Sequence, residues 1–472
     1  MIAFGTGGWR AIIGDEFTKE NVQRLALALA LRMEQEDVAA RGLCIGFDRR
    51  FLSREAAQWA AEVMAARRIH TYFIDRESPT PLIMYTVQQY GLYYGIAVTA
   101  SHNPALYNGI KLFTKGGRDA VQEITDELSA SCAGIRAEDI PAMPFEKALK
   151  AGYVEVISPY NSYIDTIIRA VNMDAIRSRD LKVVLDPMYG VSRTALQTIL
   201  LTARCEVDVI HERHDTLFGG RLPAPNERTL GALRSMVVET GADIGIATDG
   251  DADRLGIIDD EGKFVHPNEI LVLLYYYLIK YRRWRGPAVR NIATTHLLDK
   301  VAHAFGEECY EVPVGFKYVS AAIDEHNAVI GGESSGGLTV RGHISGKDGI
   351  YAGTLLVEML AVTGKKLSEL YEEITDQFGE CFMAEHDCKF DAEMKSRLQK
   401  KLMIDKELPQ FTEKVDHVSY MDGCKVYFED GWIIVRFSGT EPLLRVFCEM
   451  PTLARAEAVC KEMADFLGLQ LN

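Results

Sequence analysis

Short apolar runs rich in β-branched residues alternate with longer amphipathic stretches along most of the chain, and this alternation constrains the fold more than any other feature. Strands separated by helices of this length form largely parallel sheets with helices on both faces. The first such series predicts an α/β domain. Its expected elements are helices at about 19–35 and 53–67, a helix that starts at Pro79 or Pro81, and strands at 43–48, 70–75 and 94–98.

The same rhythm starts twice more, and then the pattern changes. The later series predict strands at 181–187, 205–211 and 243–248, a helix at about 267–282, and strands at 291–295, 308–314 and 328–332. From about residue 380 strands come in adjacent pairs, with turn signals at Asp422-Gly423 and Asp430-Gly431 before a helix at 452–467. We expect three similar α/β domains with mixed, mostly parallel sheets and a C-terminal α+β domain with an antiparallel sheet. The expected boundaries are 1–150, 151–255, 256–372 and 373–472.

Size and composition exclude several classes of function. With 472 residues the chain is too long for one hydrophobic core, and its net charge of −15 argues against a nucleic acid or an anionic membrane as partner. The apolar run 271–279 is too short to cross a bilayer, and no signal peptide is apparent. Nine cysteines without a C-x-x-C pair indicate reduced thiols, and 381–388 is interpreted as a strand rather than a zinc site. We expect a cytoplasmic location.

The first chemically distinctive stretch is Thr99-Ala-Ser101-His102-Asn103-Pro104. It places a hydroxyl after the carboxyl end of the expected strand 94–98, which is where open α/β sheets bind their ligands. Its surroundings do not match G-x-S-x-G, so the strained serine elbow of α/β hydrolases is not predicted here.

Three carboxylates follow the expected strand 243–248 at alternate positions, Asp249, Asp251 and Asp253. In extended backbone such residues project to the same side. Three carboxylates held close together repel one another, and a bound divalent cation is the simplest way to neutralise their charge. An EF-hand is excluded because Arg254 stands where that loop needs glycine. A solvated acidic turn is the alternative; the pattern favours a Mg²⁺ site with open coordination positions.

Two further loops follow expected strands. Arg436 to Pro442, with Arg445 beyond it, combines guanidiniums with the hydroxyls of a Ser-Gly-Thr turn, a set suited to gripping phosphate. The candidate phosphate ligands are Arg436, Ser438, Gly439, Thr440 and Arg445.

The other loop, Gly332-Glu333-Ser334-Ser335-Gly336, does match G-x-S-x-G, which keeps open a serine hydrolase with Ser334 as nucleophile and His343 as base. Against that alternative, 338–340 looks extended, whereas a nucleophile elbow leads directly into a helix. Glu333 and Ser335 instead suit the recognition of sugar hydroxyls.

Together these stretches resemble the α-D-phosphohexomutase family, which comprises phosphoglucomutases, phosphomannomutases and phosphoglucosamine mutases. The segment 99–104 is similar to the family's phosphoserine loop, 249–254 to its metal loop, 332–336 to its sugar-recognition loop and 436–442 to its phosphate-binding loop. Gly5-Thr6-Gly7-Gly8-Trp9-Arg10 matches its opening motif. Because the motifs occur in the family's order over the whole chain, the resemblance covers all four expected domains.

The resemblance implies that Ser101 carries a phosphoryl group, which is passed to a hexose monophosphate to give a 1,6-bisphosphate and then returned. It implies Mg²⁺ held by Ser101, Asp249, Asp251 and Asp253, and glucose 1,6-bisphosphate as activator. The other implied site residues are Arg10, Lys111, Arg254, Gly315 and Lys317. His102 directly follows Ser101, and the anion of a phosphoserine there would hold it protonated, as a hydrogen-bond donor. The substrate is a hexose phosphate, and the expected assembly is a monomer or homodimer.

The choice of sugar rests on departures from the family pattern. Gly337 stands where the glucosamine branch and many mannose mutases have histidine, and Arg341 to Gly349 looks more like the glucomutase branch. Glucose phosphate is therefore favoured, then mannose, then glucosamine phosphate. Lys347 matches the glucomutase lysine that accepts a proton, with His343 near the sugar loop, or Lys111, as alternatives. A phosphosugar phosphatase stays open as a different class of function.

Overall fold

The computed structural model describes residues 2–5, 7–438 and 443–471. The chain folds as two compact units. The first contains Met1–Ile270 and Ser335–Leu370, and the second contains Leu271–Ser334 and Tyr371–Asn472.

The first sheet lies in the first unit and has the strand order β1-β2-β6-β5-β3-β4-β8, with β7 paired to β6. Strands β5, β3 and β4 run parallel as expected, β8, which was not predicted, adds a further parallel strand, and β6 pairs antiparallel with both β2 and β5. The antiparallel strands were not among those predicted. The bounds are β1 Phe4–Gly5, β2 Gly8–Ile12, β3 Leu43–Phe47, β4 Thr71–Ile74, β5 Tyr94–Val98, β6 Tyr107–Thr114, β7 Arg118–Asp119 and β8 Val154–Ile157.

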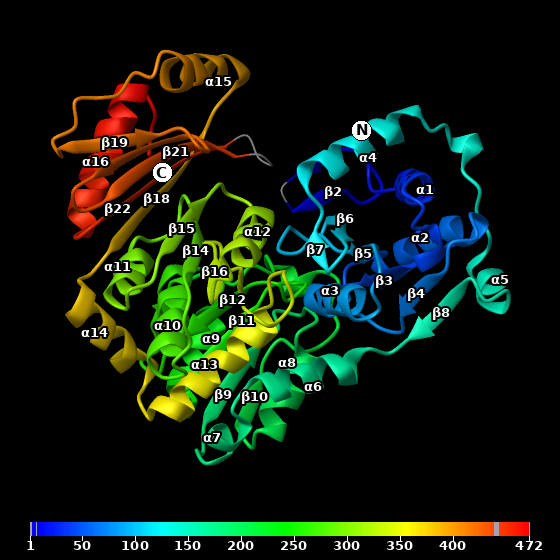
Figure 1. The fold of residues 1–472 in the computed structure, drawn as a ribbon, viewed down its shortest axis with the longest axis horizontal. Helices are drawn as coiled ribbons and strands as arrows, with labels where there is room; N and C mark the ends of the chain where they lie inside the picture. Colours follow the sequence, from blue (N-terminus) through cyan, green and yellow to red (C-terminus); the bar gives the residue numbers. More distant parts are fainter. Residues whose placement is uncertain (1, 6, 439–442, 472) are drawn as a thin grey trace. The chain divides into compact units, whose positions relative to one another are not determined.

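Helices cover this sheet on both faces: in Figure 1 strands β3 and β5 lie between α2 and α3. Helix α1 (Lys19–Gln35) begins at Thr18, whose hydroxyl accepts the Asn21 amide, as N-cap threonines do. It packs with α2 (Ser53–Ala66) into the main core of this unit. On the other face α3 (Thr80–Gln89) approaches closely, because Gly46 and Gly95 leave room for the side chains of Ile83 and Val87.

The second sheet also belongs to the first unit and has the order β10-β9-β11-β12-β13. Strand β9 pairs parallel with both neighbours, and β11 returns antiparallel into β12, so the segment 249–254 is the turn between two buried strands. The bounds are β9 Lys182–Asp186, β10 Glu206–Val209, β11 Ile244–Thr248, β12 Leu255–Ile258, β13 Phe264–Val265, α8 Arg193–Thr202, α9 Gly231–Thr240 and α13 Gly349–Thr363.

In the second unit, β14 (Ala288–Asn291) pairs parallel with β15 (Cys309–Val312) and with β16 (Ile330–Gly332). The strand predicted at 291–295 was wrong. It begins three residues earlier, at Ala288, and Asn291 ends it because the side-chain oxygen of Asn291 accepts the Ala293 amide at 2.9 Å and the Thr294 hydroxyl at 2.8 Å. Such local hydrogen bonds compete with strand pairing. Helices α11 (Leu297–Ala304) and α12 (Phe316–His326) complete this layer.

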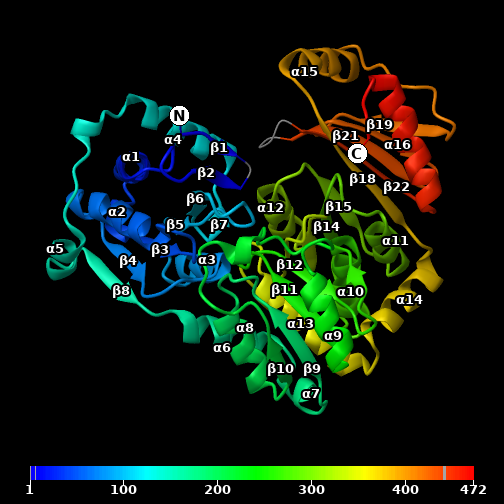
Figure 2. The ribbon, with the colours of Figure 1, turned by 180° about the vertical axis from the view of Figure 1, so that it is seen from behind.

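The C-terminal sheet is antiparallel throughout, with the order β18-β22-β21-β20-β19, which confirms the α+β prediction. Strand β18 (Phe382–Lys389) covers all but the first residue of the segment 381–388 that was predicted as a strand, and it contains Cys388. The other bounds are β19 Val415–Ser419, β20 Cys424–Phe428, β21 Trp432–Phe437, β22 Leu443–Met450, α15 Ala392–Gln399 and α16 Leu453–Leu467. Figure 2 shows α16 along the sheet, with which it shares a core.

The apolar run 271–279 lies in helix α10 (Pro267–Lys280) and is buried, as a core helix should be. Within the described part of the chain, no helix combines the length and apolarity needed to cross a membrane. The fold class predicted from sequence is confirmed; the residue limits of its four domains stay a prediction.

Candidate active site

Ser101 follows strand β5 and has its side chain aimed at the second sheet of the same unit. Its backbone has a φ of +51°, a left-handed conformation that is uncommon for a residue with a side chain. The hydroxyl donates to Asp249 Oδ2 at 2.6 Å, and the backbone amide donates to the Thr99 hydroxyl at 2.9 Å. The residue is 1% exposed. The fold thus joins the TASHNP loop to the carboxylate triplet 148 residues later.

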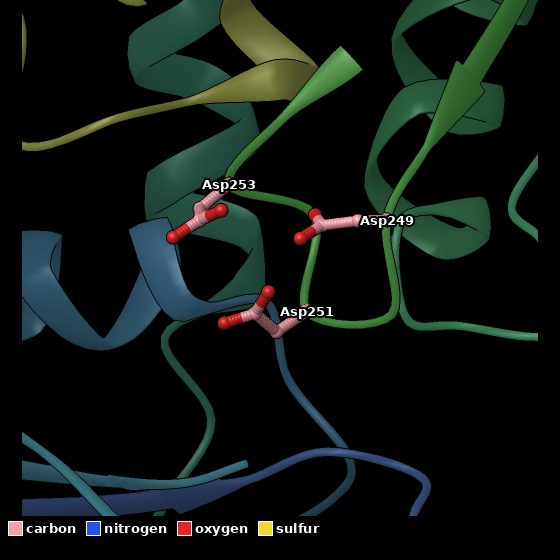
Figure 3. Close-up of side chains that lie close together, drawn as sticks. All are labelled: Asp249, Asp251 and Asp253. Atoms are coloured by element: carbon pink, nitrogen blue, oxygen red, sulfur yellow. The ribbon is translucent and has the colours of Figure 1, made fainter. Parts of the chain in front are cut away.

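The three carboxylates converge as expected, but for a different reason than the sequence suggested. Asp249, Asp251 and Asp253 are buried, and one oxygen from each lies within 4.8 Å of the others. Figure 3 shows their carboxylates turned toward a common space. The backbone is a tight turn rather than an extended strand: Ala252 has a φ of +61°, and its amide donates to the Asp249 carbonyl at 3.1 Å.

The donor set of this triplet fits a divalent cation. Oδ1 of Asp251 and Oδ1 of Asp253 are buried and have no hydrogen-bond partner among the described residues. Burial and the charges of the other two carboxylates raise the pKa of Asp249 well above its usual range. Mg²⁺ binds hard oxygen ligands such as carboxylates, and these two oxygens accept no hydrogen bond from the described residues that would compete with it. The triplet could therefore hold a metal ion, and the solvated-turn alternative does not fit its burial.

Positive side chains surround the triplet. Lys111, in β6, donates to Oδ2 of Asp251 at 2.6 Å and to Oδ2 of Asp253 at 2.7 Å. Lys347 Nζ lies 3.1 Å from Asp253 Oδ2. Lys347 and Lys111 therefore share one carboxylate oxygen of Asp253.

Arg10 and Arg254 flank the segment 99–107, which carries Ser101 and leads into β6 and is called the serine loop below, from two directions. Arg10, in β2, donates to the side-chain oxygen of Asn103 at 2.7 Å, and burial with the charge of Arg254 lowers the pKa of Arg10 to about 10. Arg254 Nη1 lies 3.1 Å from His102 Nδ1. The charge of Arg254, burial and the charge of Arg10 hold the pKa of His102 well below its usual value. A protonated His102 was predicted for phosphorylated Ser101; beside the free hydroxyl the imidazole is neutral and accepts from Arg254.

His343 lies in a different environment from the one expected of a sugar ligand or a base. Its side chain is 2% exposed, and its Nε2 is 2.6 Å from Asp348 Oδ2, which also accepts the Tyr163 hydroxyl at 2.7 Å. Asp348 Oδ1 caps helix α13 by accepting the Ile350 and Tyr351 amides. His343 therefore contributes to the anchoring of the segment that carries Lys347.

The second unit brings Glu333 and Gly315 together. Glu333 follows β16, and its Oε1 accepts the Gly315 amide at 3.0 Å and the Asn291 side-chain amide at 3.1 Å. Gly315 has a φ of +131° as the N-cap of α12, so Lys317 lies in the first helical turn. Ser334 donates its amide to the Thr294 hydroxyl at 3.2 Å. Ser335, which is exposed, belongs to the first unit.

The phosphate ligands predicted near the C-terminus are partly described. Arg436 and Arg445 are cross-strand partners in β21 and β22. Arg436 Nε donates to Asp422 Oδ2 at 2.8 Å, which also accepts the Val314 amide at 2.9 Å. Arg445 Nε lies 3.5 Å from Asp387, and Ser438 donates its amide to the Leu443 carbonyl. Gly439 and Thr440 lie outside the described residues.

Sequence reasoning missed three polar residues of this site. Asp48 and Arg50 lie behind the serine loop, and the Thr80 hydroxyl donates to Asp251 Oδ2 at 2.6 Å. A signal for the first two was present, because Asp48-Arg49-Arg50 directly follows the buried run of β3. Nothing in the local sequence points to the role of Thr80.

Comparisons with known proteins agree along the chain. Four family models match, each described as phosphoglucomutase/phosphomannomutase: alpha/beta/alpha domain I at 1–139, domain II at 161–262, domain III at 266–378, and the C-terminal domain at 393–466.

Individual relatives match over nearly their full lengths. The chain is 31% identical to the "Phosphoglucomutase/phosphomannomutase" of Thermococcus kodakarensis, covering 99% of this chain and 98% of the relative. It is 32% identical to a "Probable phosphoglucosamine mutase" of Methanosarcina barkeri, with 95% of each covered. A crystal structure of a phosphoglucomutase/phosphomannomutase family protein from Burkholderia thailandensis superposes with a TM-score of 0.84 at 22% identity, covering 100% of this chain and 99% of that one. These relatives carry names for different sugars.

Proposed function

The chain belongs to the α-D-phosphohexomutase family of isomerases, and on that premise we propose that it interconverts glucose 1-phosphate and glucose 6-phosphate through a phosphoserine at Ser101. The observation that carries this proposal is the position of the Ser101 hydroxyl, 2.6 Å from a buried carboxylate triplet that is lined by Lys111 and Lys347. A phosphoryl carrier needs positive charge for the transferring group and an open line for the attacking hydroxyl.

The proposed reaction has two transfers. In the first, the O6 hydroxyl of glucose 1-phosphate attacks phosphoserine 101: the Oγ–P bond breaks, the O6–P bond forms, and the sugar proton goes to a base. In the second, Oγ of Ser101 attacks the 1-phosphate of glucose 1,6-bisphosphate: the O1–P bond breaks, the Oγ–P bond forms, the base gives its proton to O1, and glucose 6-phosphate leaves. Lys111, Arg10 and Arg254 supply the fixed positive charge that such phosphoryl oxygens need. Added glucose 1,6-bisphosphate would activate the enzyme by phosphorylating Ser101.

Asp249, Asp251 and Asp253 would hold the metal, and the fit rests on the convergence of their carboxylates and on Oδ1 of Asp251 and of Asp253, which accept no hydrogen bond from the described residues. When Mg²⁺ is bound, it supplies positive charge against the phosphoryl oxygens. Ser101 shares this site through its hydrogen bond to Asp249.

Removal of divalent metal is expected to abolish turnover, and Mg²⁺ to restore it. Asp251→Asn should raise the Mg²⁺ concentration needed for half-maximal activity, because one anionic ligand is lost. The matched control is Asp259→Asn: Asp259 is also buried, but its Oδ1 only accepts the Glu261 and Lys263 amides of its own turn. Activity that persists in excess chelator would remove the metal role from the triplet.

The preference for glucose is supported by Gly337 and Lys347, both in the first unit. A Cβ atom at position 337 would lie 2.3 Å from Cδ of Lys347, so glycine at this position leaves the space that the Lys347 side chain occupies. Both residues belong to the stretch that resembles the glucomutase branch in sequence. Glucose and mannose differ only at C2, and a pocket can tolerate such a change. Mannose phosphate, and then glucosamine phosphate, are the alternative substrates.

One coupled assay tests the proposal: initial rates with glucose, mannose and glucosamine 1-phosphates, in Mg²⁺ and trace bisphosphate. The expected order of kcat/KM is glucose, mannose, glucosamine. Release of inorganic phosphate in place of the 6-phosphate would indicate a phosphatase. No observation favours the hydrolase: strand β17 (Leu338–Val340), and not a helix, follows Ser334 and Ser335.

The nine cysteines are all free thiols, which supports the proposed cytoplasmic location.

Arg436→Ala is expected to lower kcat/KM for both hexose phosphates and for the bisphosphate. Loss of a charge-assisted contact to the non-reacting phosphate costs roughly 1.5–3 kcal/mol, which is about one to two orders of magnitude. The control is Arg455→Ala, which removes an ion pair with Glu413 at the start of α16. An unchanged kcat/KM for Arg436→Ala, measured beside that control, would make Arg436 a structural partner of Asp422 only.

A further inference from the structure

Arg50 lies directly behind the serine loop and is fully buried, with a side-chain exposure of 0%. Its two terminal nitrogens donate to four main-chain carbonyls of that loop. Nη2 reaches the carbonyls of Ser101 at 2.6 Å and Asn103 at 2.7 Å. Nη1 reaches those of Pro104 at 2.9 Å and Tyr107 at 3.0 Å. One side chain therefore binds a seven-residue stretch of backbone at four points.

The remaining contacts of Arg50 fix the guanidinium itself. Asp48 Oδ2 lies 3.4 Å from Nε, and Asp48 Oδ1 accepts the Arg50 amide at 2.9 Å. On another side the Phe218 ring centroid lies 4.8 Å from the guanidinium carbon, a cation–π geometry. The orientation of the planar group is thus set by an ion pair and an aromatic face.

Asp48 links Arg50 to Ser101 by a second route. Its Oδ2 accepts the Thr99 hydroxyl at 2.6 Å, and the Thr99 oxygen accepts the Ser101 amide at 2.9 Å. The carbonyl of Ser101 is held by Arg50 and the amide by this Asp48–Thr99 relay. Both backbone polar groups of Ser101 are therefore held by the same network.

Such fixation matters because the conformation of Ser101 is not one that the chain adopts by default. A residue with a side chain at a φ of +51° is strained, and residues of this kind persist only where the surroundings over-determine them. A lysine could not replace the four contacts, because it has three donors on a single nitrogen, whereas arginine presents a rigid planar fork.

We propose that Arg50 is a positioning residue for phosphoryl transfer: it holds the Ser101 loop in the strained conformation that aims Oγ at the carboxylate triplet, with Asp48 and Thr99 as its relay. This inference rests on the proposed role of Ser101 as carrier. It assigns Arg50 no contact with the sugar, so its loss should affect the transfer steps and not the affinity for hexose phosphate.

The test compares Arg50→Lys with Arg49→Lys. Arg49 is the neighbouring arginine and also donates to a main-chain carbonyl, but to that of Glu212, outside the serine loop. Phosphorylated enzyme is mixed with glucose 1-phosphate, and the single-turnover rate, KM and melting temperature are measured. Misplacement of a reacting group by about 1 Å costs roughly 10²-fold. We expect a loss of that order in rate for Arg50→Lys with an unchanged KM, and no loss for Arg49→Lys.

Thr99 supplies a second pair of variants in case Arg50→Lys does not fold. Thr99→Val removes the hydroxyl relay at nearly constant shape and should slow transfer by roughly tenfold, whereas Thr99→Ser restores the hydroxyl and should restore the rate. Equal rates for Arg50→Lys and Arg49→Lys, or for Thr99→Val and Thr99→Ser, would overturn the positioning role. An active Ser101→Ala would instead overturn the proposed function, so the two failures are distinguishable.

Discussion

Ser101→Ala is expected to abolish mutase turnover while the chain stays folded. In the proposed mechanism the Ser101 hydroxyl oxygen carries the phosphoryl group, and alanine leaves no carrier at this position. Removal of the hydroxyl deletes the hydrogen bond to Asp249 and the 3.3 Å contact with His102 Nδ1, and it leaves the contacts of Arg50 to the backbone intact. Turnover with glucose 1-phosphate should fall to background, with a melting temperature close to that of the wild type.

The same experiment separates the mutase from the serine hydrolase. An active Ser101→Ala with an inactive Ser334→Ala would contradict the carrier role and favour Ser334 as nucleophile. Loss of the fold in Ser101→Ala would make its inactivity uninformative, so the melting curve is recorded on the preparation that is assayed.

Lys347→Met is expected to lower kcat by roughly 10²–10⁴ while KM changes little, because general acid–base catalysis contributes about that much. The attacking sugar hydroxyl must lose a proton, and we propose Lys347 as the acceptor. The side chain is 12% exposed and reaches the triplet through Asp253. His343, the first alternative, is bonded to Asp348 and nearly inaccessible, and Lys111 donates to two carboxylates at once. A mainly raised KM would make Lys347 a phosphate-binding residue.

Gly337 provides a matched probe of Lys347 that leaves the lysine in the chain. An added methyl group at Gly337 would collide with Cδ of Lys347, so Gly337→Ala should displace the amine and lower kcat in the same direction. In the Lys347→Met background the same change should cost much less, because residues that act through one another are not additive. Additive losses would show that Gly337 acts independently of Lys347.

Periodicity predicted most helices and parallel strands because those elements are specified locally. Helix α1, predicted at 19–35, is Lys19–Gln35. Strand β14 was misplaced because the apolar and β-branched residues after Asn291 suggested a strand, whereas the Asn291 side chain closes a turn there. The antiparallel pairing of β2 with β6 joins segments about a hundred residues apart, and no local pattern encodes such a pairing.

In the candidate site too, features encoded by neighbouring residues could be predicted, and features that depend on distant residues could not. The carboxylate triplet could be identified from its spacing, although the turn at Ala252, and not strand alternation, brings the three oxygens together. The roles of Arg50 and His343 could not be predicted, because each depends on a partner that the fold supplies. Arg50 is hydrogen-bonded to Ser101, 51 residues away. His343 contacts the carboxylate of Asp348, which caps α13.

The central claim is that phosphoryl groups pass between Ser101 and the sugar, and one measurement tests it directly. The protein is phosphorylated with glucose 1,6-bisphosphate, freed of small molecules, and mixed with glucose 1-phosphate in a single turnover, with peptide mass mapping of residue 101 and quantification of the products. The account predicts that the phosphoryl group lost from Ser101 appears on O6 of the sugar, first in glucose 1,6-bisphosphate and then in glucose 6-phosphate, while Ser101 takes up the former 1-phosphate. Its appearance as inorganic phosphate, or turnover by a protein that never carries phosphate at Ser101, would contradict the account.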